Sequence, residues 1–521
     1  MLQNKTSLFY LICFVEGGCV MAAELLGAKM LAPYFGSSLY VWATVMAITL
    51  GGLAGGYFAG GLLSTSPKRE RTLYLILILA ALFTVFMPIT AKLVFFLFGK
   101  VSLLISIVLS AILLLFPSVF FMGMVSPLLI GIITDDVQKA GQYSGRIYAL
   151  STVGGILATF LFGFYIIPTF GLTLPAVFTG VALAVIPAFR LFKSKGSTVS
   201  IILLLITGWG VASQVSPDKT TMDSPIRKVY SSEGLLGQMV ILDYPTYIYF
   251  ADTTKPKDEY SRWLFVNRIS QTYQYENANE EKGEEKYFTY VYRIKQYVDE
   301  LKKNKPKTRV LLLGLGAGSV VKMLQADDVE IDVCELDLRM PVVAEKYFGL
   351  KGNHRVFIDD ARHFININEN TYDIIIFDTF KGEVTPSHVF TLESLSKIKN
   401  MLADGGMVFV NGFGYWEGKR GMGMRSIYKT FEEVGFTAAI HPTAENEEQR
   451  NLLFIASVSA EVPEWVDFLP ISSADIAQAE VLSDEYPRFE LMNLRASLSW
   501  RNSAINMYRS DFYQQAIPLF E

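Results

Sequence analysis

The first 217 residues are dominated by long apolar runs with few charged positions. A helix of about 20 such residues crosses the hydrocarbon core of a bilayer. We therefore predict membrane-spanning helices over residues 8–31, 39–63, 72–98, 101–121, 147–168, 172–192 and 198–215. The stretch Ser118–Ile133 is shorter and is interrupted by glycine and proline, and we count it as an eighth membrane element. Residues 1–217 thus form a predicted polytopic transmembrane domain.

The pattern changes after residue 217. Residues 218–275 contain short stretches in which apolar and polar positions alternate, which is typical of β-strands. We predict strands over Gln238–Asp243, Tyr247–Phe250 and Trp263–Val266, in a small β-rich subdomain. From residue 276 to 521, buried-strand patterns alternate with helical ones, as in an α/β domain.

The clearest chemical signal in this third region is the segment Arg309–Ser319. An apolar strand, Val310–Leu313, ends at Gly314, Gly316 and Gly318, and a helical pattern follows. Glycines let a backbone take positive φ and approach a ligand closely. A strand, glycine turn and helix in this order form an anion- and nucleoside-binding corner. A tight connection without a ligand is the alternative interpretation.

Three further predicted strands end in carboxylates. Val329–Cys334 is followed by Glu335, Arg355–Ile358 by Asp359 and Asp360, and Tyr372–Phe377 by Asp378. Ligands of open α/β sheets bind outside the carboxyl ends of the strands. An acidic residue about 20 positions after the glycines can accept hydrogen bonds from ribose hydroxyls. The pattern therefore predicts a nucleoside site at one sheet edge.

Composition separates the two halves of the chain. Hydrophobic residues make up 51% of the 521 positions and charged residues 18%, which is too apolar for an ordinary soluble protein. Residues 1–220 carry a net charge of +7 and the remainder −11. No basic face for nucleic-acid binding is indicated. Cys13, Cys19 and Cys334 lack the spacing of a disulfide framework, and neither they nor the histidines form metal-ligand spacing.

Four motifs together resemble those of the spermidine synthase (aminopropyltransferase) family. They are G314-L-G-A-G-S, C334-E-L-D, D359-D-A-R and I376-F-D-T. In the membrane region, A23-E-L-L-G-A-K-M and the G145-R-I-Y-A-L-S segment resemble a group of membrane-fused members of this family. The resemblance implies a class I methyltransferase-like (Rossmann-like) fold and decarboxylated S-adenosylmethionine as the donor substrate, without a metal.

The resemblance also implies roles for individual residues. Asp378 matches the general base that takes the proton of the acceptor amine. The donor would be bound by Gln238, Gly314, Gly316, Gly318, Glu335, Asp360 and Ala361. The acceptor would contact Gln271, Tyr290, Lys381 and His388. Each has an ordinary structural alternative, such as a helix cap for Asp378 or a surface charge for Glu335.

The chain departs from the family at two places. Where the family has D-G-x-x-Q, this chain reads N267-R-I-S-Q, and where it has a second carboxylate three residues after the base, this chain has Lys381. Two ammonium groups about 5 Å apart repel by about 3 kcal/mol at an effective dielectric of 20, which disfavours a polyamine in the family's usual pose. Glu383 could replace the lost charge. The alternatives are a less cationic acceptor, or methyl transfer from S-adenosylmethionine itself.

The membrane region has features of its own. The loop with Lys68, Arg69 and Arg71 is the strongest basic cluster among the loops, which indicates a cytoplasmic position for it and for the N-terminus. Eight membrane elements would place the catalytic domain in the cytoplasm, where adenosyl-sulfonium compounds are expected. Glu16 and Glu24 lie within an apolar helix, where carboxylates are costly. Two interpretations are open: the carboxylates form ion pairs within the bundle, such as Glu24 with Lys29 or Arg146, or they line a transport path.

A transporter with a nucleoside-sensing domain is accordingly the second functional hypothesis. The predicted partners are a small-molecule amine and the lipid bilayer of the cell membrane, without nucleic acid. A homodimer stays open.

Overall fold

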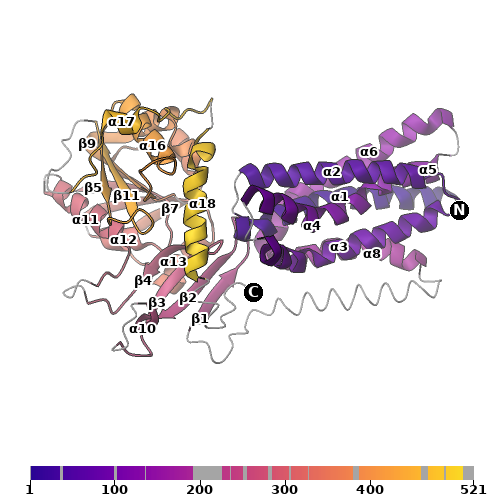
Figure 1. The fold of residues 1–521 in the computed structure, drawn as a ribbon, viewed down its shortest axis with the longest axis horizontal. Helices are drawn as coiled ribbons and strands as arrows, with labels where there is room; N and C mark the ends of the chain where they lie inside the picture. The colour runs from indigo at the N-terminus through magenta and orange to yellow at the C-terminus, as the bar shows by residue number, and fades with distance from the viewer. Residues whose placement is uncertain are drawn as a thin grey trace. The chain divides into compact units, whose positions relative to one another are not determined.

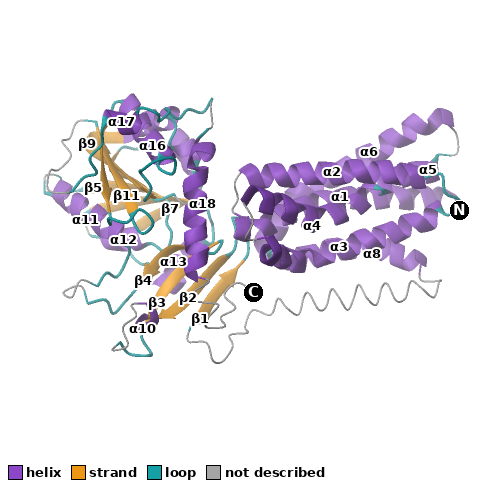
Figure 2. Ribbon diagram, in the orientation of Figure 1, coloured by secondary structure: helices purple, strands orange, loops and turns teal. Residues whose placement is uncertain are grey.

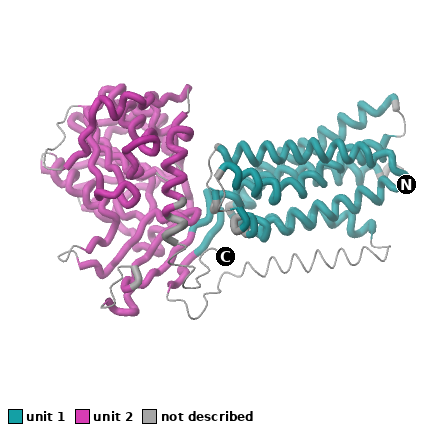
Figure 3. The backbone as a smooth tube through the Cα atoms, viewed as in Figure 1, with its two compact units in different colours: residues 1–219, 231–239 teal, residues 220–230, 240–521 magenta. Residues whose placement is uncertain are grey.

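The computed structural model divides the chain into two compact units (Figure 3). Unit 1 comprises residues 1–219 and 231–239, and unit 2 comprises residues 220–230 and 240–521. The structure describes residues 2–508 except 36–38, 99–102, 135–136, 192–225, 235, 250–254, 280–283, 304, 306, 327, 380–385, 459–466 and 486–487. The predicted three-part division at residues 217 and 275 stays a prediction.

Unit 1 is a bundle of long apolar helices (Figures 1 and 2). Its main helices are α1 (Leu2–Phe35), α2 (Leu39–Leu63), α3 (Arg69–Phe98), α4 (Leu103–Gly123), α5 (Val125–Ile133), α6 (Ala140–Leu161) and α8 (Thr173–Leu191). A 3₁₀ turn, η1 (Val137–Lys139), precedes α6, and a π-helical turn, η2 (Phe162–Ile166), links α6 to α7 (Ile167–Phe170). One buried apolar cluster runs through the bundle, whereas many large apolar side chains on its outside are exposed. Such an apolar exterior is typical of helices that face lipid.

Six stretches in the described part of the chain are long and apolar enough to cross a membrane. They are Thr6–Ala32, Tyr40–Leu63, Arg69–Ala91, Leu104–Ile133, Ala140–Ile166 and Thr173–Leu191. The element counted separately at Ser118–Ile133 joins the preceding span, because α5 has nine residues and is only about 13 Å long at 1.5 Å per residue. The predicted span at 198–215 lies outside the described residues.

The small β-rich region forms a four-stranded sheet in the order β1-β2-β3-β4. Its strands are β1 (Arg227–Ser232), β2 (Met239–Pro245), β3 (Tyr260–Val266) and β4 (Ile269–Gln274). The predicted strand at Tyr247–Phe250 is wrong, because Thr246–Tyr249 forms the single helical turn α10. Proline has no N–H to donate to a strand ladder, so Pro245 is the last residue of β2.

The larger domain of unit 2 contains a seven-stranded sheet in the order β10-β11-β9-β8-β5-β6-β7. The strands are β5 (Thr308–Leu313), β6 (Val329–Glu335), β7 (His354–Ile358), β8 (Tyr372–Phe377), β9 (Leu402–Phe413), β10 (Thr437–Pro442) and β11 (Asn451–Ser457). β5 to β9 pair in parallel, and β11 and β10 pair antiparallel at the edge beyond β9. β8 is buried along its whole length, as expected for a central parallel strand.

Helices connect and cover these strands (Figure 2). They are α11 (Thr289–Lys302), α12 (Ser319–Leu324), α13 (Met340–Phe348), α14 (Ala361–Ile367), α15 (Leu392–Met401), α16 (Met422–Val434), α17 (Ser473–Ile476) and α18 (Phe489–Tyr508). Side chains of α14, α15, α16 and α18 share one buried cluster with β5, β8 and β9. The chain leaves β5 toward β6 and β7 and then returns to β8 on the other side of β5, so the sheet has a topological switch point between β5 and β8. Open α/β sheets bind ligands at this point.

Candidate active site

The glycine turn closes against the neighbouring strand ends at the switch point. The Gly314 N–H donates to Cys334 O at 2.8 Å, and the Asp378 N–H donates to Leu313 O at 2.8 Å. Gly314 has φ +94°, and a Cβ built on it would lie 2.1 Å from the Asp378 carbonyl oxygen. The absence of a side chain at Gly314 therefore lets β5 and β8 meet at the residue predicted to be the base.

Glu335 lies at the end of β6 and holds the same turn. One carboxylate oxygen accepts the Leu315 N–H at 2.8 Å, and the other accepts the Asp337 N–H at 2.7 Å. The residue is 8% exposed. Each carboxylate oxygen can accept a second hydrogen bond. Glu335 is thus fixed in orientation at the end of β6, against the glycine turn.

Asp360 caps the N-terminus of α14 and contacts His388. Its Oδ1 accepts the N–H groups of Arg362 at 2.9 Å and His363 at 3.3 Å, while Oδ2 lies 3.3 Å from Nε2 of His388. The hydrogen bond with His388 lowers the pKa of Asp360, so its carboxylate is ionised over the neutral range. His388 belongs to the 3₁₀ turn η4 (Ser387–Val389) and thereby lies against the carboxylate predicted to bind adenine.

Asp378 follows β8 directly and accepts a hydrogen bond on each oxygen. Tyr290 of α11 donates its hydroxyl to Oδ2 at 2.9 Å, and Asn411 of β9 donates from Nδ2 to Oδ1 at 2.9 Å. Asn451 of β11 in turn donates to Oδ1 of Asn411 at 2.8 Å. Asn451 therefore orients the Asn411 amide with its N–H toward the carboxylate.

Burial raises the pKa of Asp378, and the hydrogen bonds from Asn411 and Tyr290 oppose this rise. Burial, followed by the neighbouring Asp378 charge, raises the pKa of Tyr290 well above its ordinary value. Tyr290 consequently remains a protonated donor. A carboxylate with a raised pKa and a fixed orientation is suited to take a proton from a neighbouring group.

Asn411 and Asn451 were not among the residues singled out in the sequence. The available signal is that Asn411 lies near the end of the strand that follows Asp378 in the chain. For Asn451, the contact depends on the antiparallel pairing of β11 with β9, which places Leu453 opposite Asn411. That register is not evident from the apolar pattern.

Replacing Asn411 with leucine is expected to move the acid limb of the activity profile to higher pH. The substitution removes a donor to the ionised carboxylate, so the pKa of Asp378 rises further and the base form appears at higher pH. A hydrogen bond to a charged group contributes about 1.5–3 kcal/mol, which corresponds to roughly one to two pH units. The measurement is kcat/KM against pH, with Asn451→Leu giving a smaller shift in the same direction. An unmoved limb in both variants would show that another group titrates.

Four further residues were predicted to bind the donor or the acceptor. Gln238 is half-buried before β2, in the segment grouped with unit 1. Gln271 is half-buried on β4 and donates from Nε2 to Ile269 O at 3.2 Å. Ala361 is the first residue of α14, and Lys381 lies outside the described residues. The binding roles of these four residues, like those of the glycines, stay predictions.

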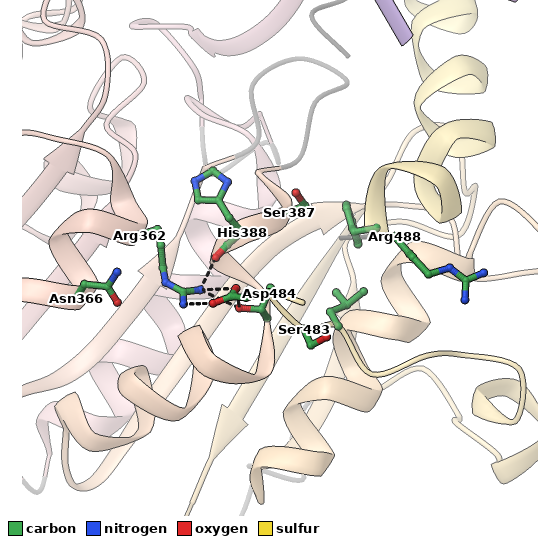
Figure 4. A pocket seen from close by; sticks show the side chains of 10 residues that line it. Arg362, Asn366, Ser387, His388, Ser483, Asp484 and Arg488 are labelled. Atoms are coloured by element: carbon green, nitrogen blue, oxygen red, sulfur yellow. Dashed lines mark hydrogen bonds and ion pairs between the residues drawn. The ribbon is translucent and has the colours of Figure 1, made fainter. Parts of the chain in front are cut away.

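A cavity of about 410 Å³ lies beside α14 and η4 (Figure 4). It is lined by Arg362, Asn366, Ser387, His388, Thr391, Leu482, Ser483, Asp484, Arg488 and Phe489. The guanidinium of Arg362 forms an ion pair with Asp484 at 2.6 Å and also donates to the His388 carbonyl oxygen at 2.7 Å. This network fixes the turn that carries His388 beside Asp360.

The seven-stranded, mostly parallel sheet and its helices define an α/β domain of the class I methyltransferase type. Residues 289–452 match the family described as "Spermine/spermidine synthase domain". The C-terminal part of the chain therefore carries a spermine/spermidine synthase domain, which confirms the resemblance seen in the sequence.

Two curated proteins are similar in sequence to part of this chain. A polyamine aminopropyltransferase of Vibrio vulnificus is 33% identical over 150 residues, covering 27% of this chain and 48% of that protein. An N-terminal histidine N-methyltransferase of Emericella nidulans is 30% identical over 141 residues, covering 26% of this chain and 24% of that protein. The chain thus spans less than half of the length of either relative.

Solved structures with a similar fold include two spermidine synthases. A probable spermidine synthase from Corynebacterium glutamicum has a TM-score of 0.35 and 19% identity, covering 50% of this chain and 91% of that chain. The spermidine synthase from Thermotoga maritima has a TM-score of 0.32 and 16% identity, covering 45% of this chain and 73% of that chain.

Proposed function

We propose that the C-terminal domain transfers an aminopropyl group from decarboxylated S-adenosylmethionine to an amine. The observation that carries this proposal is the Asp378 carboxylate, held on both oxygens by Tyr290 and Asn411 at the switch point of a spermine/spermidine synthase domain. The matching curated aminopropyltransferase supports the same reaction class.

The proposed reaction is a displacement at the carbon next to the sulfonium. The neutral acceptor nitrogen forms a bond to that carbon, the carbon–sulfur bond breaks, and methylthioadenosine leaves as a neutral thioether. The attacking nitrogen becomes positively charged and gives its extra proton to Asp378. The raised pKa of Asp378 favours this transfer, because a stronger base accepts the proton more readily.

The donor is proposed to lie along the carboxyl edge of β5, β6 and β7. Glu335 would accept hydrogen bonds from the ribose hydroxyls, because its two oxygens are oriented by Leu315 and Asp337. Asp360 would accept the adenine amino group beside His388. The glycine turn would allow the backbone to approach the nucleoside between these residues and Asp378.

The nature of the donor, and hence of the transferred group, is tested by calorimetry of the full-length protein in detergent. Decarboxylated S-adenosylmethionine is expected to bind more tightly than S-adenosylmethionine. Preferential binding of S-adenosylmethionine would instead favour methyl transfer, in line with the matching histidine N-methyltransferase and with Lys381 at the position of the family's second carboxylate. Binding of neither compound would contradict both transferase functions.

We further propose that the helical unit spans the cell membrane and that the C-terminal domain faces the cytoplasm. Six crossings bring the chain after α8 back to the side of the membrane on which it began. The loop with Lys68 lies on this same side, and its basic residues favour the cytoplasm.

Reporter fusions to the C-terminus check this orientation. Green fluorescent protein is expected to fluoresce there, and alkaline phosphatase is expected to be inactive, since it needs the oxidising side of the membrane. The same reporters inserted into the loop at Ser66 serve as a control for the cytoplasmic side. Active phosphatase at the C-terminus alone would show that the catalytic domain lies outside and would overturn the proposed orientation.

A further inference from the structure

Helices α1 and α6 pack against each other through glycines. A Cβ on Gly17 would lie 2.1 Å from the Ser151 carbonyl oxygen, and a Cβ on Gly154 would lie 2.0 Å from that of Phe14. Glycines at such positions let the backbones of two membrane helices touch. Gly17 and Gly154 therefore bring the backbones of α1 and α6 into direct contact.

Glu16 lies in this contact and is 3% exposed. Its Oε2 is 3.4 Å from the Ser151 hydroxyl, which is long compared with the 2.7–2.8 Å typical of O–H···O hydrogen bonds. Within the part of the chain that the structure describes, no ion pair involves Glu16, and none joins Glu24 to Lys29 or Arg146. The ammonium of Lys29 lies instead 5.2 Å from the centre of the Trp42 ring.

The other polar groups around Glu16 are neutral. On α1, Cys13 donates its thiol to Ile147 O of α6, and Cys19 donates to Thr179 O of α8. Tyr148 lies one turn before Ser151 on α6, and its ring contacts that of Tyr57 of α2 edge-on at 6.5 Å between centroids. None of these groups can compensate a buried negative charge. Because an isolated ionised carboxylate in such surroundings is very costly, Glu16 needs either a proton or a bound cation.

We propose that Glu16 is an exchange site of the membrane unit, which holds a proton when empty and releases it when a cationic amine binds. The ammonium group forms an ion pair with the Glu16 carboxylate, and the displaced proton passes to water, so the net charge within the bundle is unchanged. The tyrosine rings offer a face for the same cation, since ammonium groups are attracted to aromatic rings. This inference rests on the proposed membrane placement and is independent of the transferase reaction.

The test is titration calorimetry of the full-length protein in lipid nanodiscs with butylammonium chloride, in two buffers of different ionisation enthalpy. The wild type is expected to release about one proton for each butylammonium bound at Glu16, as proton linkage requires. Glu16→Gln is expected to lose this release and to bind butylammonium at least about tenfold more weakly at this site. Glu24→Gln, a half-buried carboxylate on the same helix, and Asp378→Asn are expected to retain the release.

A second measurement uses wild-type protein alone, in case Glu16→Gln does not fold. Dicyclohexylcarbodiimide modifies protonated carboxyl groups in apolar surroundings, and peptide mapping is expected to find it on Glu16, with butylammonium protecting. Unchanged proton release in Glu16→Gln, no protection, or release on addition of sodium but not butylammonium would each overturn the proposal. Loss of proton release in Asp378→Asn but not in Glu16→Gln would assign it to the transferase site instead.

Discussion

Replacing Asp378 with asparagine is expected to lower kcat by about 10³-fold while leaving the affinity for the donor unchanged, because a positioned general base contributes 10²–10⁴-fold. Asparagine keeps the size of the side chain but cannot accept the proton of the attacking amine. Its carbonyl oxygen can still accept from Asn411, and its N–H can donate to the Tyr290 hydroxyl, whose oxygen accepts as well as donates. The loss is therefore expected in the chemical step and not in folding of the sheet.

The measurement is single-turnover formation of methylthioadenosine at saturating donor, together with calorimetric donor affinity. Asp359→Asn is a matched control for the chemical step. Asp359 follows β7, and its carboxylate contacts His363 at 2.6 Å and the Asp360 N–H at 2.8 Å instead of Tyr290 or Asn411 beside Asp378. We expect that control to keep kcat within about threefold of the wild type, as for a residue outside the chemistry. An Asp378→Asn variant with more than a tenth of wild-type kcat would show that the proton goes elsewhere.

Much of this centre could be predicted from the sequence, because strand ends in a parallel sheet meet at one edge. The positions of Gly314, Glu335, Asp360 and Asp378 after apolar runs were sufficient to expect them there, and the structure has each at the carboxyl end of β5, β6, β7 or β8.

The supporting residues could not be predicted in the same way. Asn411 reaches Asp378 because β9 is the neighbour of β8, and Asn451 reaches Asn411 through the register of an antiparallel strand that lies 40 residues later in the chain. Apolar periodicity indicates which face a residue lies on, but it does not specify which strands are neighbours. In the membrane region, hydropathy shows one apolar run, whereas the structure ends α4 at Gly123 and begins α5 at Val125.

Replacing Gly314 with alanine is expected to impair both stability and turnover. The new methyl group would overlap the Asp378 carbonyl oxygen, 2.1 Å from the built Cβ, at a φ of +94° that side chains rarely adopt. Backbone strain of 1–3 kcal/mol and a similar cost for overpacking together suggest roughly 3 kcal/mol or more. For a domain of this size, the melting temperature is expected to fall by about 6–12 °C.

Gly316→Ala separates the strain of a positive φ from the steric contact. Gly316 has φ +53°, and no atom lies within 4 Å of a Cβ built there, so alanine is expected to cost only about 1–2 kcal/mol. The two variants also differ in their expected effect on turnover. Gly314→Ala pushes the Asp378 backbone away from β5, and a shift of about 1 Å in a reacting group can cost about 10²-fold in rate. Thermal unfolding and single-turnover rates would measure both effects, and equal rates in the two variants would mean that the β5–β8 contact does not position Asp378.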